Sequence, residues 1–211
     1  MTSPETQHKL LTDDAFVLEE FRRVQWLYGL KSEIRYGQER DHANGADSVA
    51  EHLFGMHLCL HYFWPLEDPE GEWDLAKMLS MITWHDIDEI VIGDTIGYDK
   101  TDEHRAAEEQ ATEEVIRQLP SHQTSVVAAL LDEYNARATR EAKFVKAIDK
   151  IEPVFHLYNP KGKKLLQEMG TTFEQNASIK VPFFKEFPVI MRFYEVIVGR
   201  MRQEGYFVEG S

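Results

Sequence analysis

The segment ITWHDIDEIVIGD, residues 82–94, places a histidine and several acidic residues inside an otherwise apolar stretch. His85 and Asp86 are adjacent, and Asp88 and Glu89 follow in the same run. Ionised carboxylates are costly to bury unless a cation or a hydrogen-bond donor compensates their charge. Either this segment is open to water, or a cation lies against it.

Two other segments each carry one residue of the metal-binding type on an apolar helical face. The apolar neighbours of His52 at helical spacing are Val49, Met56, Leu60 and Phe63. Those of Asp149 are Val145, Ile148 and Ile151, with Lys143, Lys146 and Lys150 on the predicted solvent side. Together with His85 and Asp86, these residues form a mixed nitrogen and oxygen set. Such a set suits Zn, Mn, Fe, Co or Ni more than Ca.

Each of these residues also has a purely structural explanation. A single histidine on an apolar helix, such as His52, is usually a core residue whose ring nitrogens find partners. Asp149 taken alone would pair with Lys146 or Lys150 on the surface. The adjacent pair His85-Asp86 is harder to explain in this way, but spacing along the chain does not show that the three segments converge.

A second pair of histidines offers a different metal site. His57 and His61 are four residues apart, a spacing that can bind one ion from a single helix. Helix geometry turns them well away from His52, and no acidic residue accompanies them. We therefore interpret this pair as structural or interfacial.

The hydrophobic pattern predicts an all-α fold, a single compact helical bundle over residues 1–211. Apolar residues recur at helical spacing, and no segment alternates as a strand would. Ser48 and Glu51 form a capping box, which predicts a helix from Ser48 to a turn at residues 65–71. Further helices are predicted over residues 13–30, 73–92, 102–118, 121–136, 139–158, 161–169 and 184–203. Loops are predicted at residues 31–46, which include Asn44-Gly45, and around Gly97. Helix 73–92 is predicted to end at Gly93. A break in the chain of helices is predicted at Val181-Pro182.

Composition and charge exclude several classes of protein. The 211 residues suffice for one domain with a hydrophobic core. The formal net charge of −14 argues against binding to nucleic-acid polymers, but not against a small phosphorylated substrate held by local cations. No segment has the length and hydrophobicity of a membrane span, and the polar N-terminus is unlike a signal peptide. With the single Cys59, these features predict a cytoplasmic protein.

Five phrases together resemble the HD-domain superfamily of metal-dependent phosphohydrolases, whose signature is the order His…His-Asp…Asp. They are SVAEH ending at His52, HDIDE from His85, Gly93-Asp94, EHRAAEEQA from Glu103 and EAKFVKAID ending at Asp149. The closer resemblance is to the 5′-deoxynucleotidase group, which removes phosphate from deoxynucleoside 5′-monophosphates. The resemblance covers about residues 15–160, and the helices expected over 161–205 add little to it.

The resemblance implies a metal site and a reaction. One divalent ion, which could be Mn, Co, Zn, Fe, Ni or Mg, would be held by His52, His85, Asp86 and Asp149. A metal-activated water would attack the phosphorus of a nucleoside 5′-monophosphate. The resemblance further implies that Glu89 orients this water or the substrate and that Asp94 exchanges a proton with the reacting oxygens.

The same resemblance assigns the substrate contacts. In the family an arginine holds the phosphate and a tryptophan presses against the sugar, and the corresponding residues here are Arg35 and Tyr36. Tyrosine in place of tryptophan changes the size of the ring and adds a hydroxyl, which weakens the expected preference for deoxyribose. Glu133 is the candidate for an acidic residue near the sugar. Because the family is commonly dimeric, a homodimer is expected.

Two alternatives stay open at this point. Some HD-domain proteins are oxygenases or phosphodiesterases with two metal ions, which need further histidines between the His-Asp pair and the last aspartate; His104 and His122 lie in that interval. The chain could also be a non-catalytic module that binds a nucleotide and uses the metal as a structural clamp.

Overall fold

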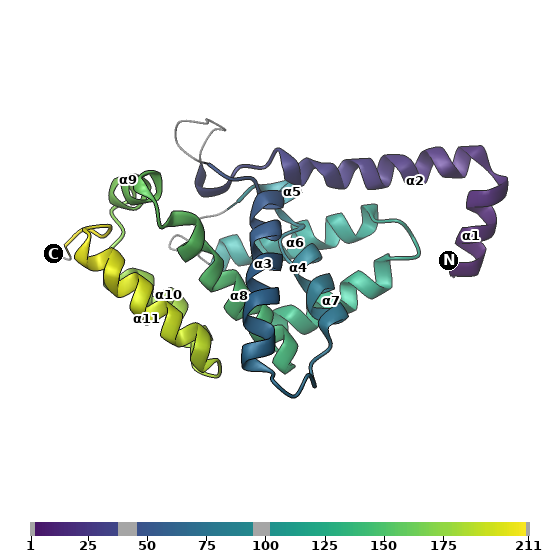
Figure 1. Cartoon of the computed structure of the whole chain (residues 1–211). Coiled ribbons are helices and arrows are strands. Elements are labelled where there is room, and N and C mark those ends of the chain that lie inside the picture. Colours follow the sequence, from purple (N-terminus) through teal and green to yellow (C-terminus); the bar gives the residue numbers. More distant parts are fainter. Residues whose placement is uncertain (1–2, 38–45, 95–101, 210–211) are drawn as a thin grey trace.

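The computed structural model describes residues 3–37, 46–94 and 102–209, which form a bundle of helices (Figure 1). Within these ranges there are helices and two isolated β-bridges but no named strand, so the all-α prediction is confirmed. The loops predicted at Asn44-Gly45 and around Gly97 lie outside the described residues.

The centre of the bundle is helix α8 (Arg140–Leu157), which is buried along most of its length. The helices that pack on it are α3 (Val49–Glu67), α4 (Leu75–Trp84), α7 (Thr124–Ala136), α10 (Phe173–Phe184) and α11 (Pro188–Gln203). The side chains of α3 and α8 that share the core include Met56, Leu60, Phe63, Phe144, Ile148 and Ile151. A residue on the inner face of α3 or α8 therefore lies inside the domain.

Helix α3 begins where the capping box predicts. The Ser48 hydroxyl accepts a hydrogen bond from the Glu51 backbone N–H at 3.3 Å, and the Glu51 carboxylate accepts one from the Ser48 N–H at 2.7 Å. These two bonds satisfy N–H groups that have no partner within the helix. The helix then continues through Pro65 to Glu67, past the start of the predicted turn. His52 lies one turn inside the capped end, on the buried face.

The single helix predicted over residues 73–92 is wrong. Helix α4 ends at Trp84, residues 85–88 form turns, and a short helix α5 follows (Glu89–Ile92). Nδ1 of His85 is hydrogen-bonded to the carbonyl of Ile82 at 3.0 Å, a side-chain contact that competes with regular helix geometry. Gly93 ends α5 as predicted, with a φ of 76° that a side chain would disfavour.

The predicted break at Val181-Pro182 is also wrong. Residues 173–184 form α10, and Pro182 lies in its last turn. The start of this helix is fixed by a second capping box, in which the side chains of Thr172 and Gln175 bond to each other's backbone N–H groups. The remaining predicted helices are present as α6 (Asp102–Gln118), α7, α8, α9 (Pro160–Glu168) and α11.

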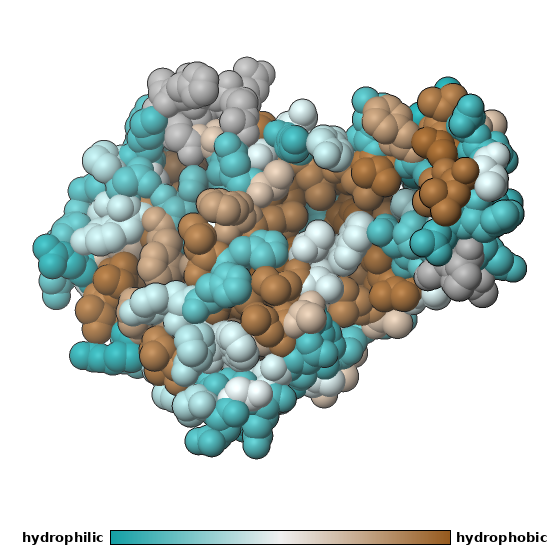
Figure 2. Space-filling model, turned by 45° about the vertical axis from the view of Figure 1, so that its right-hand side comes forward, coloured by the Kyte–Doolittle hydropathy of each residue, from teal (hydrophilic) through white to brown (hydrophobic). Residues whose placement is uncertain are grey.

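The N-terminal helices α1 (Ser3–Thr12) and α2 (Asp14–Leu27) extend away from the bundle (Figure 1). The short helices η1 (Tyr28–Lys31) and η2 (Arg35–Gly37) lead from α2 back to it. Several apolar side chains of α2 are exposed, including Val17, Leu18, Phe21 and Val24. Figure 2 shows hydrophobic surface on the side of the molecule that carries this extension. Among the described helices, none combines the length and hydrophobicity that crossing a bilayer needs.

Candidate metal centre

Three of the four predicted ligands converge beneath the capped end of α3. Ligand atoms of His52, His85 and Asp86 all lie within 4.8 Å of one another. The closest pair is His85 Nε2 and Asp86 Oδ2 at 3.0 Å, and His52 Nε2 is 3.8 Å from the same oxygen. Ligands bonded to one ion at about 2.0–2.2 Å must lie roughly 3–4 Å apart, so this spacing fits a shared metal.

Asp149, the fourth predicted ligand, lies beside this group, next to His52. Its Oδ1 lies 3.6 Å from His52 Nε2, while its Oδ2 forms ion pairs with Lys146 at 2.8 Å and Lys150 at 3.0 Å. The prediction that these lysines mark the solvent side needs correction, because both are mostly buried and both contact Asp149. One carboxylate oxygen thus remains directed at His52.

Both imidazole rings are oriented so that Nε2 faces the group. A carboxylate or carbonyl oxygen can only accept, so the ring nitrogen opposite it must carry the proton. Nδ1 of His52 therefore donates to Glu152 at 2.6 Å, and Nδ1 of His85 donates to the carbonyl of Ile82. The two Nε2 atoms are buried and have no hydrogen-bond partner among the described residues. A lone pair on each is left for an ion.

The charges around His52 favour a cation at this point. Burial and the nearby Arg35 act to lower the pKa of His52, but the adjacent carboxylates of Asp149 and Glu152 outweigh them and raise it to about 9. Burial alone would raise the pKa of Asp86, yet His85 beside it holds that pKa well below its usual range. Burial opposes the ionisation of Asp149 too, and Lys146 and Lys150 keep its pKa well below the normal value. Ionised carboxylates and oriented imidazoles form a donor set that fits a divalent transition metal.

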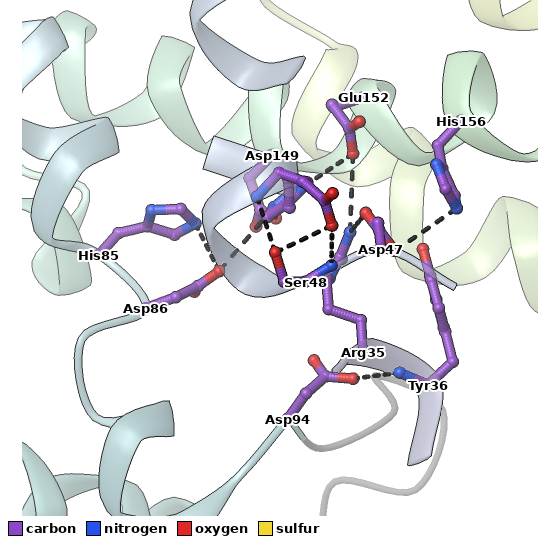
Figure 3. A network of polar contacts seen from close by, with 12 residues as sticks. Arg35, Tyr36, Asp47, Ser48, His85, Asp86, Asp94, Asp149, Glu152 and His156 are labelled. Atoms are coloured by element: carbon purple, nitrogen blue, oxygen red, sulfur yellow. Dashed lines mark hydrogen bonds and ion pairs between the residues drawn. The ribbon is translucent and has the colours of Figure 1, made fainter. Parts of the chain in front are cut away.

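Glu89 and Asp94 lie at the side of the cluster rather than in it. One oxygen of Glu89 is buried without a hydrogen-bond partner in the described chain. Burial, followed by the charges of Asp86 and Asp94, raises the pKa of Glu89 well above its usual value. Asp94 accepts a hydrogen bond from the Tyr36 backbone N–H at 2.6 Å, and so ties the end of α5 to η2 (Figure 3).

Arg35 and Tyr36 line a cavity that lies beside the cluster. Arg35 is buried, and its guanidinium lies 3.4 Å from Asp47, 3.7 Å from Glu152 and 4.9 Å from the centre of the Tyr36 ring. Tyr36 has a left-handed backbone with φ 63°, stacks on the His156 ring and leaves its hydroxyl buried without a partner among the described residues. Both side chains line a cavity of about 90 Å³ that also borders Asp149.

Glu133 is not brought to this cavity. Its carboxylate accepts a hydrogen bond from Thr139 and forms an ion pair with Lys77 at 2.9 Å. The next residue, Tyr134, is the one that reaches the cluster, with its ring 5.4 Å from that of His85. The substrate contact predicted for Glu133 stays a prediction from the resemblance alone.

Glu152 is the main residue that the sequence interpretation missed. It lies one turn after Asp149 on α8, is buried, and fixes the proton on His52 through the 2.6 Å bond. Gly55 of α3 makes room for it, because a Cβ there would lie 2.5 Å from Glu152 Oε1. The available signal was an acidic residue inside the apolar run of α8, three residues after a suspected ligand.

Replacing Glu152 by glutamine should weaken metal binding by about 10–100-fold, the usual effect of losing a carboxylate that orients a histidine ligand. Isothermal titration of the metal-stripped protein with Mn²⁺ measures this change. Glu168→Gln, on the exposed face of α9, is the matched control. Equal affinity in Glu152→Gln and the wild type would show that the bond to His52 does not matter for the metal.

Four further histidines, all within the described residues, lie outside the cluster. His57 donates a hydrogen bond from Nδ1 to the carbonyl of Leu53 in its own helix, and His61 is exposed, which agrees with their structural interpretation. His104 is exposed on α6, and His122 lies 3.9 Å from Glu20 of α2. Among the described residues, neither of these last two joins the clustered donor atoms.

Comparisons with known proteins agree with this geometry. A family model described as "HD domain" matches residues 27–191. The chain is 28% identical over 128 residues to 5′-deoxynucleotidase HDDC2 of Homo sapiens, covering 59% of this chain and 60% of that protein. It is 28% identical over 142 residues to 5′-deoxynucleotidase hdd1 of Schizosaccharomyces pombe, covering 64% and 63%. The chain thus spans about 60% of the length of the curated relatives it matches.

A solved structure shares the fold. The crystal structure of a predicted metal-dependent phosphohydrolase from Magnetospirillum magnetotacticum superposes with a TM-score of 0.76 and 21% identity, over 92% of this chain and 98% of that one. The family model covers well over half of the chain and includes every residue of the metal cluster. The chain therefore belongs to the HD-domain family.

Proposed function

We propose that this chain is a phosphohydrolase that removes phosphate from nucleoside 5′-monophosphates, with one divalent ion held by His52, His85, Asp86 and Asp149. The observation that carries the proposal is the pair of buried histidine Nε2 atoms that lack partners in the described chain and face two carboxylates. The names of the relatives support the reaction, and the cavity beside the cluster supports a phosphorylated substrate.

The ion would lower the pKa of a bound water from about 16 to about 7–9 and offset negative charge on the phosphoryl oxygens. The side chains of this protein supply the positioning. Arg35 offers a planar fork of donors to the phosphate, since its contacts with Asp47 and Glu152 do not use all five N–H groups. Glu89 orients the attacking water, and Asp94 exchanges a proton with the reacting oxygens.

The sugar would lie against Tyr36. Its ring is stacked on His156 and its hydroxyl is buried without a partner in the described residues, so a hydroxyl of the substrate can bond to it. A site that offers such a partner discriminates weakly against the 2′-hydroxyl of ribose. We expect ribonucleotides to be hydrolysed within about 100-fold of deoxyribonucleotides in kcat/KM.

Phosphate release from a panel of ribo- and deoxyribonucleoside 5′-monophosphates tests the proposal. The protein is stripped of metal and reloaded separately with Mn, Co, Zn and Mg, and stripped protein serves as the blank. Release with at least one metal supports the function. Release with none would refute it, and a preference for deoxyribose far above 100-fold would refute the role of Tyr36.

Three accompanying expectations remain proposals. The net charge of −14 favours a small substrate over a nucleic-acid polymer. A cytoplasmic location follows from the sequence features and can be checked by fractionation. A homodimer is favoured by exposed apolar side chains on one face of α3, which light scattering can test as twice the mass of one chain; they are Phe54, Leu58, Tyr62 and Leu66.

A further inference from the structure

The cavity beside the metal cluster is lined by a residue from outside the motif-bearing region. Besides Arg35, Tyr36 and Asp149, its polar lining includes Lys150 of α8 and Lys180 of α10. The rest of the wall is mostly apolar and comes from α8 to α11. Lys180 is only 6% exposed, so its ammonium lies within the bundle.

The cations of this cavity differ in how their charges are balanced. Arg35 has Asp47 and Glu152 within 4 Å, and Lys150 has Asp149 at 3.0 Å. Lys180 makes one contact, a hydrogen bond of 2.7 Å from its Nζ to the backbone carbonyl of Lys150. In the described part of the chain, no carboxylate forms an ion pair with it.

An ammonium group carries three donors, and only one is used here. A buried charge without a counter-ion is strongly disfavoured, and it is usually kept for a ligand or a partner of opposite sign. Burial and the charge of Lys150 lower the pKa of Lys180 to about 7, although the more distant charges of Asp149 and Glu152 act to raise it. The group that would restore the balance is an anion in the cavity.

We propose that Lys180 is a further substrate-binding residue, whose ammonium pairs with the phosphate oxygens of the nucleotide in this cavity. Arg35 and Lys180, which line the same cavity as Asp149, would then both contact the phosphate. This inference rests on the proposed function for the identity of the ligand. The anion-binding role itself depends only on the cavity and the unpaired charge.

Binding of inorganic phosphate, the expected product, tests this role without any turnover. Isothermal titration of the Mn²⁺-loaded protein compares wild type with Lys180→Gln and Lys180→Arg. Glutamine keeps an N–H donor for the Lys150 carbonyl but removes the charge, whereas arginine keeps the charge. We expect phosphate affinity to fall at least tenfold in Lys180→Gln and to recover largely in Lys180→Arg, with KM for the nucleotide changing more than kcat.

The matched control is Lys164→Gln, a largely exposed lysine of α9 paired with Glu168, which should bind phosphate as the wild type does. Thermal unfolding without phosphate separates the two roles of Lys180. If Lys180 serves mainly to hold α10 against α8 through its bond to Lys150, Lys180→Gln should be less stable than the wild type. If its charge is unpaired without a ligand, the variant should be equally stable or more stable. Wild-type phosphate affinity in Lys180→Gln would overturn the proposal, whatever its stability.

The two proposals can fail separately. If phosphate binding depends on Lys180 but no nucleotide is hydrolysed, the anion site stands and the proposed function falls. If nucleotides are hydrolysed and the Lys180 variants bind phosphate normally, only the role of Lys180 falls.

Discussion

Replacing His85 by alanine is expected to abolish metal binding and phosphate release together. The ring is almost fully buried, and its Nε2 lies 3.0 Å from Asp86, so no neighbouring group or solvent can take its place. Residues that only orient metal ligands contribute about 10–100-fold to affinity, so loss of a ligand should exceed about 100-fold. Titration with Mn²⁺ and phosphate release from a deoxynucleoside monophosphate measure the two effects.

The control for this variant is His57→Ala. Like His85, His57 has a ring nitrogen bonded to a backbone carbonyl, but it lies within α3 and outside the cluster. It should retain metal and activity. Because His85 also bonds to Ile82, thermal unfolding of both variants shows whether the fold survives. A folded His85→Ala protein that keeps wild-type metal affinity would contradict the ligand assignment.

Replacing Asp94 by asparagine is expected to leave metal binding unchanged and to lower kcat by about 100–10,000-fold, the usual contribution of a group that transfers a proton. The carboxylate of Asp94 is outside the clustered ligand atoms, so the metal should stay. Its bond to the Tyr36 N–H at 2.6 Å can be made by an amide oxygen as well. The asparagine variant therefore removes the acid–base group and retains the tie to η2.

The alanine variant at the same position provides the comparison. Asp94→Ala loses both the proton-transfer group and the acceptor for Tyr36, so it should also raise KM by loosening Arg35 and Tyr36. Equal kcat for Asp94→Asn and the wild type, measured by initial rates at saturating nucleotide, would exclude a catalytic role for Asp94.

The ligand set could be predicted because each part has a local signal. His52 is four residues after Ser48 and directly follows Glu51, the two residues of the capping box. This box fixes where α3 starts and therefore which face of the helix is inside. Asp149 lies on a helix with an apolar pattern so complete that an acid stands out. In both cases local helix rules place the side chain, and burial of α8 against α3 brings them together.

The turn at residues 85–88 could not be predicted from the same rules. The apolar pattern continues from α4 into α5, so helical periodicity favours one unbroken helix. In such a helix the side chains of His85 and Asp86 would diverge by about 100°. The turn instead lets both reach the same point, 3.0 Å apart. The long-range contacts with His52 and Asp149 that favour this geometry leave no local trace.

Glu152 and Lys180 were missed for a related reason. The partner of Glu152, His52, is 100 residues away in the sequence, and nothing near Glu152 indicates the contact. Lys180 lies in α10, a helix that was not predicted, although Thr172 and Gln175 have the spacing of a capping box at its start. Proline lacks the N–H that would bond to the carbonyl four residues earlier, which is why it indicates a break, yet α10 continues past Pro182 to Phe184.

The most direct test of the central claim is a titration of metal-stripped protein with Mn²⁺, in which phosphate release from a deoxynucleoside 5′-monophosphate is followed at each addition. The proposed single site predicts that activity rises in proportion to bound metal and reaches its plateau at one ion per chain. A plateau at two ions per chain, or bound metal without phosphate release, would contradict the assignment of this cluster as the centre of a one-metal phosphohydrolase.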